Sequence, residues 1–78
     1  MLQGVAVSDN YGKVLLFDVD GIRCERRLVA RPAEDIAREL SASSPVGRAL
    51  VSMQVGDSVT VKAPAGDVVV KVLKARSS

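Results

Sequence analysis

The closest candidates for catalytic chemistry in this sequence are two carboxylates, Asp18 and Asp20, which stand two positions apart. Side chains at that spacing share one face of a strand, where a pair of carboxylates can act as general acid and base. Gly21 follows Asp20 directly, however, and the Asp-Gly dipeptide is a strong hairpin-turn signal. We therefore interpret these carboxylates as part of a turn and predict no catalytic residues.

The sequence also lacks the partners that other common chemistries need. It contains no histidine, so neither a Ser-His nor a Cys-His nucleophile pair can form, and zinc would lack its usual nitrogen ligand. Gly47, Gly56 and Gly66 are separated by a predicted helix and a predicted strand, so they do not form a phosphate-binding loop. We predict a protein that is not an enzyme and that uses no metal and no cofactor.

A run of arginines is the main candidate for contact with nucleic acid. Residues 23–31 contain a single acidic residue, Glu25, and four arginines, Arg23, Arg26, Arg27 and Arg31. Lys71, Lys74 and Arg76 either extend this surface or protect an edge strand. The net charge of +2 is too small to indicate nucleic-acid binding by itself. Two interpretations stay open, a phosphate contact and a solvated strand face.

Length and composition indicate one small domain. A chain of 78 residues, of which 47% are hydrophobic, can form a single core, and we treat residues 1–78 as one unit. No apolar run approaches the roughly 20 residues of a membrane-spanning helix. The start, Met1-Leu2-Gln3-Gly4, lacks a basic segment followed by an apolar one, so we expect no secretory signal. The single cysteine, Cys24, allows no internal disulfide, which predicts a cytoplasmic protein with Cys24 in its core.

The first predicted element is a hairpin. Residues 13–19 are rich in branched and aromatic types, and the Asp20-Gly21 turn follows them. The second arm, residues 22–30, alternates imperfectly. Arg26 falls on its apolar face, so either a bulge turns the side chain outward or its stem lies along the core.

The middle of the chain predicts one uncertain element and one well-defined helix. Residues 32–40 favour a short helix opened by Pro32, with Glu34 and Arg38 as an ion pair; the alternative makes Leu40-Ser41 the end of a short third strand. A second helix begins where Ser44 can accept a hydrogen bond from an early amide and Pro45 needs no partner. Its apolar face is formed by Val46, Ala49, Leu50 and Met53, Gly47 allows close approach, and Gly56 either ends the helix or turns into the next strand.

The last third of the chain predicts two strands. Residues 57–63 alternate between apolar and polar types, residues 64–67 form a Pro/Gly turn, and residues 68–73 are apolar on nearly both sides, which indicates a central strand. The predicted fold is α+β, a twisted antiparallel sheet of four to five strands packed on one main helix.

An ordered set of motifs resembles the C-terminal domain of the GreA/GreB transcription elongation factors. The most specific run is Ser44-Pro45-x-Gly47-x-Ala49-Leu50, followed by Val55-Gly56-Asp57 and Pro64-x-Gly66. The resemblance extends over roughly residues 11–75 through Tyr11-Gly12-Lys13-Val14, Asp20-Gly21, Leu28-Val29 and Leu40-Ser41. It implies an FKBP-like fold. Arg26 departs from the family, which commonly has an aromatic residue there, and residues 32–39 replace a more acidic loop.

The resemblance also implies a partner. Gre factors bind bacterial RNA polymerase, and this domain docks on a coiled coil of the largest subunit at the rim of the secondary channel. The contact loop carries over onto Ser43, Ser44 and Pro45, and we extend the expected contact to the neighbouring Val46 and Arg48. Full Gre factors also have an N-terminal coiled coil with acidic residues at its tip, which assist transcript cleavage. Only about ten residues precede the first predicted hairpin here, too few to reach a distant active site. We therefore expect transcription regulation without cleavage.

Two alternatives belong to other classes of function. A small basic nucleic-acid-binding module would show steep salt dependence, whereas a docking domain would bind protein in the absence of nucleic acid. A structural module that pairs through an exposed strand edge would dimerise as its concentration rises.

Overall fold

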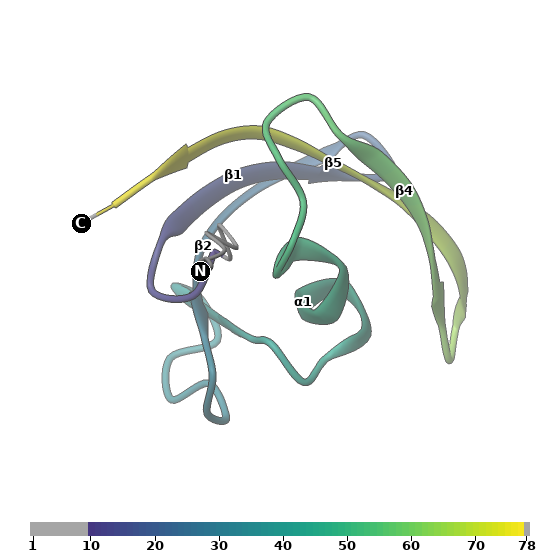
Figure 1. The fold of residues 1–78 in the computed structure, drawn as a ribbon. Helices are drawn as coiled ribbons and strands as arrows, with labels where there is room; N and C mark the ends of the chain where they lie inside the picture. The colour runs from purple at the N-terminus through teal and green to yellow at the C-terminus, as the bar shows by residue number, and fades with distance from the viewer. Residues whose placement is uncertain (1–9, 78) are drawn as a thin grey trace, which may run out of the picture.

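Two hairpins form most of the sheet in the computed structural model, which describes residues 10–77 (Figure 1). The first joins β1 (Val14–Val19) to β2 (Ile22–Val29), and both residues of its turn, Asp20 and Gly21, have positive φ angles of 51° and 85°. Asp-Gly pairs favour this turn because both positions need positive φ. The second hairpin joins β4 (Ser58–Ala63) to β5 (Gly66–Arg76). The prediction about a secretory signal concerns residues 1–4, which lie outside the described residues.

The sheet has five strands in the order β3-β2-β1-β5-β4. Neighbouring strands are antiparallel except β2 and the short strand β3 (Glu39–Ser41), which run parallel. The sheet is therefore mixed and not entirely antiparallel as predicted, because β3 pairs parallel to β2. The predicted α+β class, with four to five strands packed on one main helix, is confirmed. β5 has a partner on each side, as the apolar run 68–73 indicated.

The helix favoured for residues 32–40 is wrong, and the alternative third strand is present as β3. Asp35 holds this segment in turns: its carboxylate accepts from the Ala37 N–H at 3.1 Å, and its carbonyl accepts from Arg38 and Glu39. Ile36, the main apolar residue of the expected helix, is 81% exposed and has no core to pack on. Arg38 pairs with Asp35 at 3.8 Å and Glu34 with Arg31 at 3.8 Å, rather than with each other.

The helix α1 (Pro45–Leu50) covers the concave face of the curled sheet (Figure 1). It ends at Leu50, one turn earlier than the apolar spacing predicts, yet Met53 is still buried in the turn that follows. Gly56 has a φ of 96° and makes the turn toward β4, the second of its two predicted roles. The helix has six residues, so no helix within residues 10–77 is long enough to cross a membrane.

The core fills the space between α1 and the concave face of the sheet. Alternate residues of β1, β2 and β5 point into it, and its largest fully buried side chains are Leu15, Leu28, Leu50, Val70 and Val72. Cys24 is half-buried and packs against this core. The uncovered convex face of the sheet carries the remaining residues of each strand.

Candidate docking site

The chain enters α1 through a serine-rich turn whose three serine hydroxyls are all hydrogen-bonded. The Ser44 hydroxyl accepts from the Gly47 N–H at 3.0 Å and donates to the Ser41 carbonyl at 2.7 Å. The Ser43 hydroxyl lies 2.8 Å from that of Ser41, which also accepts from the Ser43 N–H at 3.2 Å. These bonds hold the turn in one conformation, so a partner that binds it has little ordering cost to overcome.

We call Ser43, Ser44, Pro45, Val46 and Arg48 the docking corner. Ser43, Pro45 and Arg48 are exposed, whereas Ser44 and Val46 are half-buried. The sequence-predicted residues are thus together at one end of α1, with two polar groups and a proline ring open to solvent. Ser44 is the helix N-cap and Pro45 is the first helical residue, as predicted.

Gly47 explains why the helix can lie so close to this turn. A Cβ atom at this position would overlap the Ser41 carbonyl oxygen and would lie 2.8 Å from the Ser44 hydroxyl oxygen. The glycine therefore lets α1 pack directly on the backbone that leaves β3. The docking corner depends on this contact, because the contact fixes the helix against the sheet.

An apolar groove adjoins the docking corner, and sequence reasoning missed it. The groove has a volume of about 420 Å³ and shares Ser44 and Val46 with the corner. Its apolar lining comes from β1, β2, β3 and the loop before β3, namely Phe17, Val19, Cys24, Ala33, Ile36 and Leu40. The sequence signal that could have found it is Ile36, an isoleucine in a segment with too few apolar neighbours to bury it.

Arg26 lies at the edge of this groove, and the second of its two predicted arrangements is correct. The β1–β2 pairing continues past Arg26 without a shift, so no bulge turns it outward. Its guanidinium donates to the backbone carbonyls of Glu25 at 2.8 Å and Ile36 at 3.2 Å. Arg26 therefore ties the loop before β3 to the sheet.

The carboxylate of Glu39 holds the same loop. We call this carboxylate and its hydrogen-bond donors the Glu39 latch. Arg31 donates two hydrogen bonds to it, at 2.8 and 3.1 Å, and the backbone N–H groups of Glu34 and Asp35 donate at 2.9 and 3.5 Å. The bonds from Arg31, followed by the bond from Glu34, lower the pKa of Glu39 from 4.5 to about 2. The bond to Glu39 also raises the pKa of Arg31.

The latch predicts a specific acid sensitivity. The pKa of Glu39 is lower in the folded chain, so the unfolded chain binds this proton more tightly. The latch therefore stabilises the fold fully above pH 4.5, and this contribution is lost as the pH falls toward about 2. We expect the urea midpoint of the wild type to fall over this interval, and that of Glu39→Gln to fall less, as measured by circular dichroism.

Two further variants separate the latch from general acid effects. Arg31→Gln removes the side-chain donor, so its urea midpoint should also fall less than that of the wild type over the same pH interval. Arg38→Gln, at a side chain that is 86% exposed, should keep the wild-type profile. Identical acid profiles for Glu39→Gln and the wild type would contradict a contribution from the latch.

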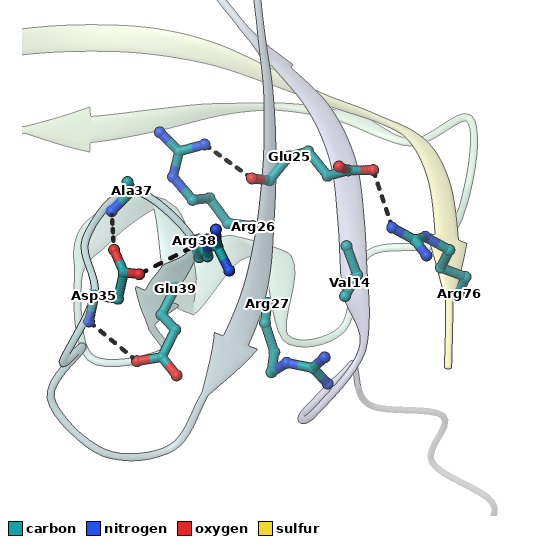
Figure 2. A pocket seen from close by; sticks show the side chains of 9 residues that line it. All are labelled: Val14, Glu25, Arg26, Arg27, Asp35, Ala37, Arg38, Glu39 and Arg76. Carbon is teal, nitrogen blue, oxygen red and sulfur yellow. Dashed lines mark hydrogen bonds and ion pairs between the residues drawn. The ribbon is translucent and has the colours of Figure 1, made fainter. Parts of the chain in front are cut away.

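The four arginines proposed for nucleic-acid contact do not share one surface. Arg26 and Arg27 leave β2 on opposite sides (Figure 2), because successive strand residues alternate. Figure 2 also shows Glu25 between Arg26 and Arg76, with its carboxylate 3.4 Å from the Arg76 guanidinium. Arg31 is engaged with Glu39. Only Arg23 and Arg27 point to the convex face, so the predicted set is split by the pleat of the strand.

Asn10 binds the C-terminal end of α1 and was not singled out from the sequence. It is 4% exposed, and its side-chain amide donates to the carbonyls of Leu50 at 2.6 Å and Met53 at 2.7 Å. Its backbone N–H donates to the Val51 carbonyl at 2.9 Å. Asn10 thus satisfies carbonyls that the end of a short helix leaves without partners.

Comparison with known families decides what this arrangement represents. The family model "Transcription elongation factor, GreA/GreB, C-term" matches residues 11–77. The chain belongs to the GreA/GreB C-terminal domain family. The resemblance inferred from the Ser-Pro motif is therefore confirmed.

Relatives agree with this assignment. The chain is 38% identical over 60 residues to the transcription elongation factor GreA of Vesicomyosocius okutanii, an alignment that covers 76% of the chain and 38% of the relative. It is 49% identical over 41 residues to GreA of Ruthia magnifica, covering 53% of the chain and 26% of the relative. The chain thus spans well under half the length of these GreA proteins.

Solved structures show the same architecture. The GreA factor homolog 1 of Thermus thermophilus superposes with a TM-score of 0.65 at 26% identity, covering 97% of this chain and 53% of that one. A GreA/GreB factor from Nitrosomonas europaea has a TM-score of 0.65 at 20% identity and covers 92% of this chain, which supports the fold alone.

Proposed function

We propose that this Gre-family domain docks on the coiled coil of the largest RNA polymerase subunit at the rim of the secondary channel, through the docking corner. The observation that carries the proposal is the exposure of Ser43 and Pro45 on a turn that is rigidly bonded to α1. A polymerase partner places the domain in the cytoplasm.

The apolar groove beside the corner supports a helical partner. A helix recognised in a groove inserts apolar side chains from one face. Phe17, Leu40 and Val46 supply an apolar lining for such a side chain, and Ile36 adds an exposed apolar edge. Arg48 is exposed at the corner and favours an acidic residue on the partner.

An amide chemical-shift titration with the isolated rim coiled coil tests the proposal. The largest shifts are expected at residues 42–48. Pro45→Ala should weaken binding by about tenfold, because it removes an exposed ring at the centre of the contact. Pro64→Ala, a change of the same kind at the exposed turn between β4 and β5, is the matched control and should bind like the wild type.

Two results would count against docking through this corner. One is equal binding by the Pro45→Ala and Pro64→Ala variants. The other is a set of shifts confined to residues 23–31 that needs added nucleic acid. Either would move the contact away from the entrance to α1.

We further propose that the 78-residue chain modulates transcription without stimulating transcript cleavage. The family match supports this proposal, because the matching model describes the C-terminal domain. The resemblance to Gre factors assigns assistance in cleavage to the acidic tip of the coiled coil, which is not part of that domain. Stalled elongation complexes incubated with the chain should yield no shortened transcripts, while the chain should compete with a full-length Gre factor and reduce its cleavage products. Cleavage by the chain alone would refute this.

A further inference from the structure

The convex face of the sheet carries a compact group of basic side chains. Register places residues of three strands side by side in three rows: Asp18 lies between Arg23 and Lys71, Leu16 between Glu25 and Lys74, and Val14 between Arg27 and Arg76. We call these nine residues the convex patch. They point away from the core, because Leu15 and Phe17, which alternate with them on β1, are buried.

A β-bulge brings the β5 residues of the patch onto one face. Lys71 and Lys74 are three positions apart and would lie on opposite faces of a regular strand. The β1–β5 register shifts between Leu16 and Phe17, so Leu73 is the extra residue and Lys74 returns to the face of Lys71. Lys71, Lys74 and Arg76 thereby form one basic line along β5, parallel to Arg23 and Arg27 on β2.

The patch concentrates positive charge that the whole chain does not show. It contains five of the 11 lysines and arginines but only two of the nine acidic residues, a net charge of +3 against +2 for the chain. Arg23 is 3.5 Å from Asp18 and Arg76 is 3.4 Å from Glu25. Within residues 10–77, neither Lys71 nor Lys74 has a carboxylate within 4.0 Å.

The patch is also open. No helix or strand of the described chain covers the convex face, since α1 lies on the concave side (Figure 1). The side chains of Arg23 and Arg76 are 67% and 65% exposed, and Lys71 and Lys74 are exposed as well. The two basic lines are separated by β1, which sets them about 10 Å apart at the usual strand spacing.

We propose that the convex patch binds the phosphodiester backbone of a nucleic-acid duplex without reading its bases. Two separated lines of cations facing solvent suit a surface that has phosphates on two strands. The patch contains no aromatic residue: Phe17 is buried in the core, and Tyr11 precedes β1. Binding to single strands relies on bases stacked on aromatic side chains, so this face favours a duplex. The site lies on a different face from the docking corner and does not depend on the proposed docking.

Fluorescence anisotropy with a labelled duplex of about 20 base pairs, at about 50 to 200 mM salt, tests the proposal. The slope of log K against log salt concentration should be negative and no steeper than about −4.5. This limit follows because each of the five cations that contacts a phosphate contributes about −0.9 to the slope. Lys71→Gln with Lys74→Gln should make this slope shallower by about 2. Glu25→Gln, which removes an exposed carboxylate from the patch, should tighten binding.

The matched control is Arg38→Gln with Arg48→Gln, which removes the same charge from exposed arginines outside the patch and should leave the slope unchanged. Separate arms with DNA duplex, RNA duplex and single-stranded DNA identify the source of the backbone. The proposal is overturned if the wild type binds neither duplex at the lowest salt, if the single strand binds more tightly than both duplexes, or if the control pair lowers the slope as much as the lysine pair. The docking corner is tested with protein alone, so either result can fail without the other.

Discussion

Gly47→Ala is expected to lower the free energy of unfolding by about 3 kcal/mol, toward the upper end of the usual cost of overpacking a core. The new methyl group would overlap the Ser41 carbonyl oxygen and lie 2.8 Å from the carbonyl carbon. These are backbone atoms and cannot rotate away, so α1 must move off β3. A chain of 78 residues has a total stability of about 4 to 12 kcal/mol, so the loss is a large fraction.

Urea unfolding followed by circular dichroism measures this effect. Arg48→Ala, the next residue on the same helix, is exposed and serves as the control, with an expected change below about 0.5 kcal/mol. The Gly47→Ala variant should also bind the rim coiled coil more weakly, because moving α1 displaces Pro45 and Val46. Wild-type stability for Gly47→Ala would contradict the close contact between α1 and Ser41.

Asn10→Ala is expected to destabilise the fold by about 3 kcal/mol. The substitution leaves the carbonyls of Leu50 and Met53 without their side-chain donor, and each buried polar group left unpaired costs about 1 to 3 kcal/mol. Asn10→Asp should cost more at neutral pH, because it keeps the shape of the side chain but points a carboxylate oxygen at two carbonyl oxygens. Urea midpoints of the three proteins should fall in the order Asn, Ala, Asp.

Two observations check that this loss comes from the end of α1. Ser52→Ala, an exposed change in the same turn, should unfold like the wild type. The amide resonances of residues 50–53 should shift in Asn10→Ala, while those of Ser43 and Ser44 at the opposite end of the helix should not. An alanine variant as stable as the wild type would show that the two carbonyls do not depend on Asn10.

Several elements could be predicted because neighbouring residues determine them. Asp20-Gly21 makes its turn through the positive φ of both residues, a preference that belongs to the dipeptide itself. Ser44 and Pro45 start α1 through a cap bond that joins residues three positions apart. The docking corner was found for the same reason, since all its members lie within six consecutive positions.

The segment before β3 could not be predicted in the same way. Its apolar stripe is weak, so contacts with distant residues decide its shape. The Arg27 N–H donates to the Arg38 carbonyl at 2.7 Å, and Arg26 reaches the Ile36 carbonyl from β2. Glu39 holds the rest of the loop through Arg31. These bonds form only when β3 lies parallel to β2, a pairing for which the local sequence has no signal.

The sequence by itself determined the two hairpins, the capped start of α1 and, through its ordered motifs, the family. Tertiary structure alone decided the role of Asn10, which reaches carbonyls 40 and 43 positions away, and the apolar groove, which is lined by β1, β2 and the stretch 33–46. It also decided the convex patch, because strand register and one bulge place Arg76 beside Glu25, 51 positions away. The physical reason is range: backbone preferences act between neighbours in the chain, whereas burial, register and the sharing of a face follow from which distant segments pair.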